Sequence, residues 1–259
     1  MKDFLKDVIV EAGRTSLDYR ARLSSVQVSK KSPKNLVTEA DVAIERFLVE
    51  QIQRRFPDHA ILGEEGGTHD GREYRWIIDP IDGTNSFFHH QPFYSTSIAV
   101  ERNGELLLGA VYAPVLGELF LAERGQGASL NGTPIRVSME DRLIDCLLGT
   151  GFACMRDNLK RNNLPYLTVL LPKILDLRRS GSVAIDLCYV ACGRLDGFWE
   201  LNLRLYDIAA GMLILEEAGG MLSNFTGARS PIGDELVASN GLIHTEMVAL
   251  LSGVDKLHR

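Results

Sequence analysis

The chain has 259 residues, of which 45% are hydrophobic and 24% charged, and its net charge is −6 at pH 7. These are ordinary values for a globular protein, and the length allows one large domain or two smaller ones. The acidic balance argues against a nucleic-acid surface, which would show a basic field. No run reaches the ~18 apolar residues of a membrane span, and the N-terminal segment lacks a signal peptide's apolar core.

The four cysteines, Cys146, Cys154, Cys188 and Cys192, include no CxxC pair. Cys188 and Cys192 lie four positions apart, but no third and fourth ligand follow at a spacing typical of zinc sites. We therefore expect reduced, mostly buried thiols in a cytoplasmic protein.

The first half of the chain begins with helices and continues with short strands. A helical period of apolar residues covers 3–24, a polar connection follows at 25–37, and a second helix is predicted from Thr38 to about Arg55. The predicted strands are Ala60–Gly63, Arg75–Ile78, Ser95–Glu101, Glu105–Tyr112 and Glu118–Ala122. Asn103-Gly104 and Asn131-Gly132 are typical of two-residue hairpin turns.

After about residue 143 helices and strands alternate. The predicted elements are a strand at Cys146–Thr150, a helix near 157–175 interrupted at Pro165, a helix at 183–192, a strand at Leu195–Leu201, a helix at Tyr206–Ala218, strands at Met221–Ser223 and Glu235–Ser239, and a last helix from about Thr245. The mixture predicts α+β layers, with a soft boundary that separates residues 1–143 from residues 144–259 without a flexible linker.

The segment Trp76–Phe88, WIIDPIDGTNSFF, is the most informative in the chain. Its apolar start predicts the end of a buried strand, and Asp79 and Asp82 follow three positions apart. At about 4 Å and an effective dielectric near 20, two such charges repel by roughly 4 kcal/mol. A hard divalent cation between them is therefore expected. Gly83 and Thr84 then suit a tight turn with exposed backbone N–H groups.

Further acids stand where predicted elements begin or end. Glu64 and Glu65 follow an apolar strand in GEEGG, Asp207 opens a helix in LYDIAAG, and Asp41 lies in VTEADV. Each also has a structural interpretation when taken alone. The glutamates suit a solvated loop end, Asp207 would complement a helix dipole, and Asp41 could form a capping box with Thr38.

Taken together, these motifs are typical of one family. DPIDGT, preceded by GEE and followed far downstream by YDIAAG and EEAGG, resembles the inositol monophosphatase family of Mg²⁺-dependent, lithium-sensitive phosphatases. The resemblance runs from KNLVTEAD at 34–41 to VASN at 237–240. It implies the layered α-β-α-β-α sandwich of the sugar phosphatases, an active site between the two halves and a homodimer.

The resemblance also implies two or three Mg²⁺ ions per active site and a role for each acid. Glu64, Asp79 and the backbone carbonyl of Ile81 would hold the first metal, and Asp79 would bridge to a second one. The second metal would also be held by Asp82 and Asp207. Catalytic roles fall to Asp41 and Thr84, which would orient and deprotonate the attacking water, and to Glu65, which would act behind the ligands or through water.

The expected substrate contacts come from both halves of the chain. The N–H groups of Gly83 and Thr84 would take the phosphate. The remaining contacts implied by the resemblance are Gly181, Ser182 and Val183 against the sugar alcohol, Glu200 on its hydroxyls, and the basic residues Lys30 and Arg178. Ser182 is equally suited to be a helix N-cap.

The predicted function is hydrolysis of myo-inositol 1-phosphate or a close polyol phosphate. Arg179, beside Arg178, leaves a sugar bisphosphate such as fructose 1,6-bisphosphate open, and histidinol phosphate and a 3′-phosphonucleotide are further alternatives. Tyr206 stands where the family usually has Trp, which keeps an aromatic plane beside Asp207. A catalytically silent binding protein on the same fold is the alternative from a different functional class.

Overall fold

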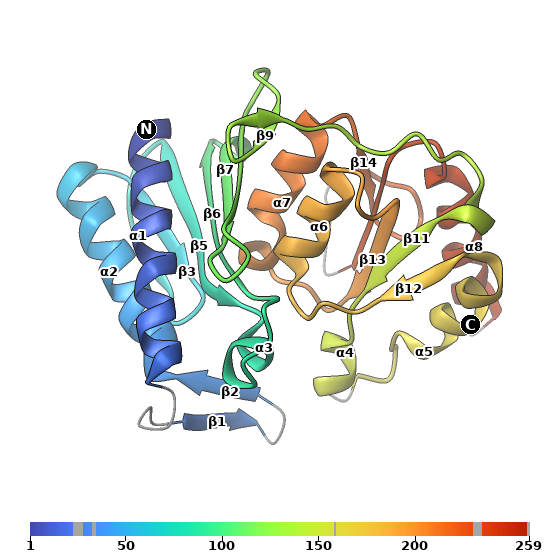
Figure 1. Cartoon of the computed structure of the whole chain (residues 1–259), viewed down its shortest axis with the longest axis horizontal. Coiled ribbons are helices and arrows are strands. Elements are labelled where there is room, and N and C mark those ends of the chain that lie inside the picture. Colours follow the sequence, from blue (N-terminus) through green and yellow to red (C-terminus); the bar gives the residue numbers. More distant parts are fainter. Residues whose placement is uncertain (23–27, 33–34, 158, 230–234, 258–259) are drawn as a thin grey trace.

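The computed structural model describes residues 1–22, 28–32, 35–157, 159–229 and 235–257, with side chains for all of these except residues 28–32, 35–38, 156 and 255–257. The elements stack in five layers of helix, sheet, helix, sheet and helix (Figure 1). This is the α-β-α-β-α sandwich that the family resemblance implied.

The first sheet has eight strands in the order β10-β9-β8-β7-β6-β5-β3-β4. Its strands are β3 (Ala60–Gly63), β4 (Thr68–His69), β5 (Tyr74–Asp82), β6 (Ser95–Arg102), β7 (Glu105–Ala113), β8 (Glu118–Glu123), β9 (Ala128–Leu130) and β10 (Thr133–Pro134). All neighbouring pairs are antiparallel except β3 and β5, which run parallel.

Helices cover both faces of this sheet. The outer face packs against α1 (Lys2–Ala21) and α2 (Glu39–Arg55), and the inner face packs against α6 (Val183–Ala191) and α7 (Leu205–Glu217) (Figure 1). Successive side chains of a strand point to opposite faces, so Trp76 and Ile78 join the outer core while Ile77 joins the inner one. A strand covered on both faces reads as a continuous apolar run, which explains the sequence WII before Asp79.

The second sheet lies beyond α6 and α7 and has five strands in the order β12-β11-β13-β15-β14. They are β11 (Leu147–Thr150), β12 (Asp176–Arg178), β13 (Gly197–Leu201), β14 (Met221–Ser223) and β15 (Glu235–Ser239). Its outer face packs against α5 (Leu164–Leu170) and α8 (His244–Leu257). The smaller elements are β1 (Val28–Ser32), β2 (Asn35–Thr38), α3 (Thr84–Phe88), α4 (Ala153–Arg156) and two 3₁₀ turns, Leu143–Asp145 and Leu171–Lys173.

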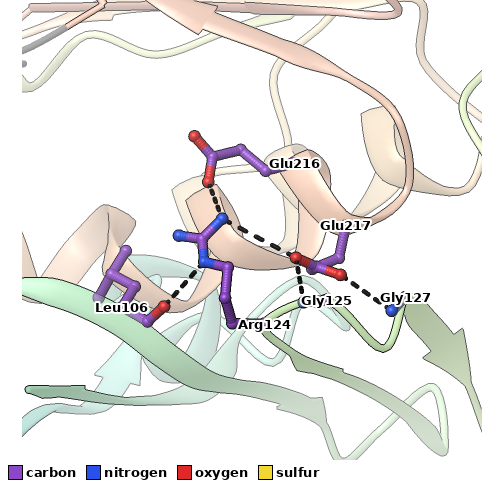
Figure 2. Close-up of polar contacts among 6 residues, drawn as sticks. All are labelled: Leu106, Arg124, Gly125, Gly127, Glu216 and Glu217. Atoms are coloured by element: carbon purple, nitrogen blue, oxygen red, sulfur yellow. Dashed lines mark hydrogen bonds and ion pairs between the residues drawn. The ribbon is translucent and has the colours of Figure 1, made fainter.

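A polar clamp holds the C-terminal end of α7 against the turn between β8 and β9 (Figure 2). The two carboxylate oxygens of Glu217 accept the N–H groups of Gly125 and Gly127, each at 2.9 Å. Arg124 donates to Glu216 at 2.7 Å. Asp207 is the third residue of α7 and lies in its first turn. The clamp therefore holds the end of α7 opposite to the one that reaches the pocket described below.

Most predicted elements agree with the structure, and both Asn-Gly turns join paired strands. Two expectations were wrong. The polar connection at 25–37 contains β1 and β2. In addition, β4 and its pairing with β3 had no counterpart among the predicted elements. The helix predicted near 157–175 is instead α4, α5, a 3₁₀ turn and β12, because Pro165 lies in the first turn of α5 and begins that helix.

Two further features of the fold bear on the expectations. The cysteines are free thiols, three of them buried and Cys192 partly so. Among the described residues, none of the helices combines the length and the apolar character needed to cross a bilayer. The boundary near residue 143 stays a prediction, and the core around α6 and α7 contains side chains from both sides of it, such as Val111 and Leu213.

Candidate active site

A pocket lies where the ends of β5 and β13 meet the first turns of α3, α6 and α7. The residues that line it are Glu64, Asp79, Ile81, Asp82, Gly83, Thr84, Asn85, Gly151, Ala153, Arg179, Gly181, Ser182, Val183, Asp186, Glu200, Leu203 and Asp207. They include six carboxyl groups and one guanidinium group, so this part of the described surface is strongly acidic. The first half of the chain supplies seven of these residues and the second half supplies ten.

The end of β5 brings the two acids of the central motif into this pocket. β5 extends to Asp82, and its pairing with β6 shifts register between Asp79 and Asp82. Both carboxyl groups are buried, and Oδ1 of Asp79 has no hydrogen-bond partner. Burial raises the pKa of Asp79 well above its usual range, and the carboxylates of Glu64, Asp82, Asp207 and Asp41 raise it further.

Asp82 lies against the N-terminus of α6. Its Oδ2 accepts hydrogen bonds from the Ser182 hydroxyl at 2.6 Å and from the N–H of Ala184 at 2.7 Å. The Ser182 oxygen also accepts the N–H of Ile185, so Ser182 is the helix N-cap that its sequence context allowed. The contact between Ser182 and a substrate stays a prediction.

Gly83 is a glycine for two reasons. Its φ of 91° lies in the left-handed region that other residues avoid. A Cβ there would stand 2.9 Å from the carbonyl oxygen of Phe93 and 3.2 Å from that of Gly181. The turn after Asp82 therefore touches the loop before α6, and the two halves of the chain meet at Gly83 and Gly181.

Asp207 is partly buried and enters the pocket from the first turn of α7. Its Oδ2 accepts the N–H of Arg204 at 2.6 Å, so it does complement the helix N-terminus, as its structural interpretation expected. Burial raises the pKa of Asp207 well above its usual range, and the carboxylates of Asp82, Glu64 and Glu200 raise it further. The hydrogen bond from the Arg204 N–H lowers this pKa, but not enough to cancel the rise. Helix capping and participation in the acidic cluster thus coexist in one side chain.

Most of the other predicted site residues also line the pocket: Glu64, Ile81, Thr84, Gly181, Val183 and Glu200. The Thr84 hydroxyl donates to the Ile81 carbonyl at 3.2 Å. Asp41 and Glu65 are not lining residues, although the Asp41 carboxylate is close enough to act on Asp79. The side chain of Lys30 lies outside the described residues.

Arg178 does not take the place expected for it. It forms an ion pair with Asp176 at 2.5 Å and is not among the residues that line the pocket. Its neighbour Arg179 does line the pocket, and a Cβ on Gly181 would meet the Arg179 guanidinium at 2.7 Å. Arg178 is the last residue of β12 and Arg179 follows the strand, and of the two only Arg179 lines the pocket.

Two acids that sequence reasoning passed over belong to the site. Asp186 lines the pocket from α6, and its signal was an acid inside the otherwise apolar helix VAIDLCYVA. Glu45 is buried on α2 and accepts the N–H groups of Glu65 and Gly66, which holds the loop that carries Glu64. A Cβ on Gly63 or Gly66 would collide with the Glu45 carboxylate, which explains the glycines that flank the two glutamates.

The donor set fits a hard divalent cation. As they stand, no three His, Cys, Asp or Glu side chains among the described residues are arranged to hold a metal ion. The pocket nevertheless gathers carboxylates and the Ile81 carbonyl in one place, and the buried Oδ1 of Asp79 has no partner. Oxygen donors of this kind are the ligands that Mg²⁺ prefers. A cation bound among these acids would replace their mutual repulsion with attraction to the metal.

Comparison with known proteins agrees with this geometry. The family model for the inositol monophosphatase family matches residues 2–255. A Nus factor SuhB of Pseudomonas aeruginosa is 45% identical over 80% of this chain and 79% of its own, and an inositol-1-monophosphatase of Mesorhizobium japonicum is 38% identical over 95% and 93%. The crystal structure of the extragenic suppressor protein suhB from Bartonella henselae superposes with a TM-score of 0.91 at 35% identity, covering 96% of this chain and 97% of that one. The chain belongs to the inositol monophosphatase family.

Proposed function

We propose that this protein is a Mg²⁺-dependent phosphomonoesterase that hydrolyses myo-inositol 1-phosphate, or a close polyol phosphate, to the free alcohol and inorganic phosphate. The observation that supports this most directly is the convergence of acids from both halves of the chain on one pocket that also contains Gly83, Thr84 and Glu200. The inositol-1-monophosphatase of M. japonicum, which this chain matches over nearly its whole length, supports the choice of substrate.

The side chains that would hold the metal are Glu64, Asp79, Asp82 and Asp207, together with the carbonyl oxygen of Ile81. When bound, Mg²⁺ would lower the pKa of the attacking water and neutralise charge on the phosphate oxygens. Asp79 is the least exposed acid of this set and has an oxygen without a hydrogen-bond partner. It would be the ligand shared by two metal ions, as the family resemblance implies. Asp82 and Asp207 each keep one oxygen tied to a helix N-terminus, which fixes the orientation of the carboxylate.

The chain's own groups would orient the reaction. The N–H groups of Gly83 and Thr84, at the start of α3, would receive the phosphate. The Thr84 hydroxyl, already hydrogen-bonded at the end of β5, would orient the attacking water together with the Asp41 carboxylate, which would accept the proton. Glu65 would assist from behind Glu64. No covalent enzyme intermediate is needed for this direct displacement.

The alcohol would lie against α6 and β13. Glu200 is buried, and its Oε1 accepts the N–H of Ala153 at 2.9 Å. A Cβ on Gly151 would come within 2.0 Å of the Glu200 carboxylate, so a glycine at this position is what leaves room for the acid. Glu200 would accept hydrogen bonds from the hydroxyls of the polyol, with Gly181, Ser182 and Val183 beside them.

Arg179 supports a second candidate substrate. It is the guanidinium group that reaches the pocket among the described residues, and a second phosphate of a sugar bisphosphate would be its natural partner. Fructose 1,6-bisphosphate is therefore the alternative substrate to test beside inositol 1-phosphate.

The test is phosphate release by the purified protein from inositol 1-phosphate, fructose 1,6-bisphosphate and histidinol phosphate, with Mg²⁺ or EDTA and with or without Li⁺. We expect Mg²⁺-dependent release that is fastest with inositol 1-phosphate and is inhibited by Li⁺. The P. aeruginosa relative is named a Nus factor rather than an enzyme. Absence of release from every ester would therefore favour the catalytically silent alternative. We further propose a cytoplasmic homodimer, which light scattering after size exclusion would check.

A further inference from the structure

Asp186 is a carboxyl group in the pocket whose hydrogen bonding is incomplete. It lies on α6 and is only 2% exposed. Ser180 hydrogen-bonds to its side chain, whereas Oδ1 is buried without any partner. The carboxyl carbon stands 3.7 Å from where a Cβ on Gly149 would be, so the group lies against β11, and Asp186 also lines the pocket.

This arrangement is costly for the fold alone. A buried carboxyl oxygen without a partner loses the hydrogen bonds that water would have given it. Burial raises the pKa of Asp186 well above its usual range, and the nearby Glu200 and Asp82 carboxylates raise it further. The Ser180 hydroxyl and the Arg179 guanidinium oppose that shift without reaching Oδ1. An apolar residue would satisfy the helix better, so a ligand group is the natural partner for Oδ1.

We propose that Asp186 is a specificity-determining residue whose Oδ1 binds a hydroxyl group of the polyol, next to the hydroxyl that Glu200 binds. The inference rests on the proposed function. Asp186 and Glu200 come from different elements, α6 and β13, both line the pocket, and they are close enough for their charges to interact. The pair therefore selects an alcohol that offers two hydroxyls at once, as a ring polyol does.

The cost of leaving a buried carboxyl group without a hydrogen bond also determines which substrates are rejected. A substrate with both hydroxyls satisfies two buried carboxyl groups, whereas an ester without them leaves both unpaired after water has been expelled. Sites built to hydrogen-bond a hydroxyl reject analogues that lack it much more strongly than apolar pockets reject extra groups. Discrimination between a polyol phosphate and a bare alkyl phosphate is thus the property that Asp186 controls.

The experiment compares inositol 1-phosphate with cyclohexyl phosphate, which has the same ring without the other hydroxyls. Asp186→Asn keeps the shape of the side chain. The amide replaces one of the two acceptor oxygens with an NH₂ group, which cannot accept a hydrogen bond from a hydroxyl. We expect the ratio of kcat/KM for inositol 1-phosphate to kcat/KM for cyclohexyl phosphate to fall about 10- to 100-fold, mainly through KM of inositol 1-phosphate. Asp145→Asn, the same change at an exposed carboxylate outside the pocket, should leave that ratio unchanged.

Three outcomes would overturn the inference. A ratio that does not change in Asp186→Asn, with the wild-type protein active, shows that no hydroxyl is bound there. An equal fall with both esters, together with a higher Mg²⁺ requirement, assigns Asp186 to the metal instead. The same fall in Ser180→Ala shows that Asp186 acts only by holding the loop before α6. Absence of wild-type activity on both esters would instead refute the proposed function, and this inference with it.

Discussion

Asp82 and Ser182, one hundred positions apart in the sequence, are joined by a buried hydrogen bond of 2.6 Å. One end of it belongs to the strand that carries the central acids, and the other is the N-cap of α6. The bond therefore couples the orientation of a proposed metal ligand to the start of the helix that lines the alcohol side of the pocket.

Ser182→Ala removes both the N-cap and this bond. We expect a loss of about 2 kcal/mol in the free energy of unfolding, because the N–H of Ile185 and the Asp82 carboxylate lose a buried partner together. Urea unfolding measures the loss. Ser252→Ala, whose hydroxyl bonds only to its own helix, is the matched control and should stay within about 0.5 kcal/mol of wild type. An equal loss in the two variants would show that the interaction between the halves contributes nothing.

Asp79→Asn tests the electrostatics of the acidic cluster. Burial and its neighbouring carboxylates make the charge of Asp79 unfavourable, so the neutral variant should be more stable than wild type in EDTA by about 1–2 kcal/mol. With Mg²⁺ at 100 times its dissociation constant, wild type should gain about 2.7 kcal/mol, whereas the variant should gain much less and be inactive. Thermal unfolding in the two buffers provides the measurement. A destabilised variant in EDTA would contradict the proposed repulsion.

Glu45→Gln tests the support of the loop that carries Glu64. The carboxylate accepts two backbone N–H groups, and an amide would turn its own NH₂ group toward one of them. A lost hydrogen bond to a charged group costs about 1.5–3 kcal/mol. Part of this free energy should appear as weaker Mg²⁺ binding, so that half-maximal activity needs a roughly tenfold higher Mg²⁺ concentration. Glu50→Gln, on the exposed side of α2, should leave the Mg²⁺ titration unchanged.

His244 gives the protein a defined response to acid. The imidazole is buried between the hydroxyl groups of Ser223, at 2.8 Å, and Ser239, at 2.9 Å. Burial, and to a smaller extent the charge of Arg229, lowers its pKa from 6.5 to about 4. The native state thus binds fewer protons than the unfolded state between these values, so stability is complete above pH 6.5 and declines as the pH falls toward 4.

The decline attributable to His244 should be about 2 kcal/mol between pH 6.5 and pH 4. Urea unfolding of wild type and of His244→Gln over that range isolates it, because carboxylates contribute equally to both proteins. The variant should be less stable at pH 7 and should lose less stability on acidification. His90→Gln, at an exposed histidine, should follow the wild-type profile; identical profiles for all three proteins would exclude His244 as the source.

The elements that could be predicted are those that a short local pattern determines. The apolar run before Asp79 predicted a buried strand, and the Asn-Gly turns predicted their hairpins. The segment near 157–175 failed, because periodicity alone could not show that Pro165 begins a helix. The short β1–β2 pair was missed because the sequence of this segment, VSKKSPKNLVT, is largely polar.

The site was predicted where motif and resemblance agreed, and missed where a residue acts through tertiary contact. Glu64 and Asp207 were found because each follows a recognisable motif. Glu45 was passed over because its partners are backbone groups twenty positions away. Whether Arg178 or Arg179 reaches the pocket depends on the tertiary position of the segment at the end of β12. Two adjacent arginines in a sequence do not reveal that position.

The clamp between Glu217 and the turn at Arg124–Gly127 holds the C-terminal end of α7, and the first turn of the same helix carries Asp207 into the pocket. A helix of thirteen residues is about 20 Å long, so the surface turn and the pocket are connected by a rigid strut. Lengthening the turn by one residue would push or tilt the strut and carry Asp207 with it. A change in the length of this distant surface turn is therefore expected to alter the position of an acid in the pocket.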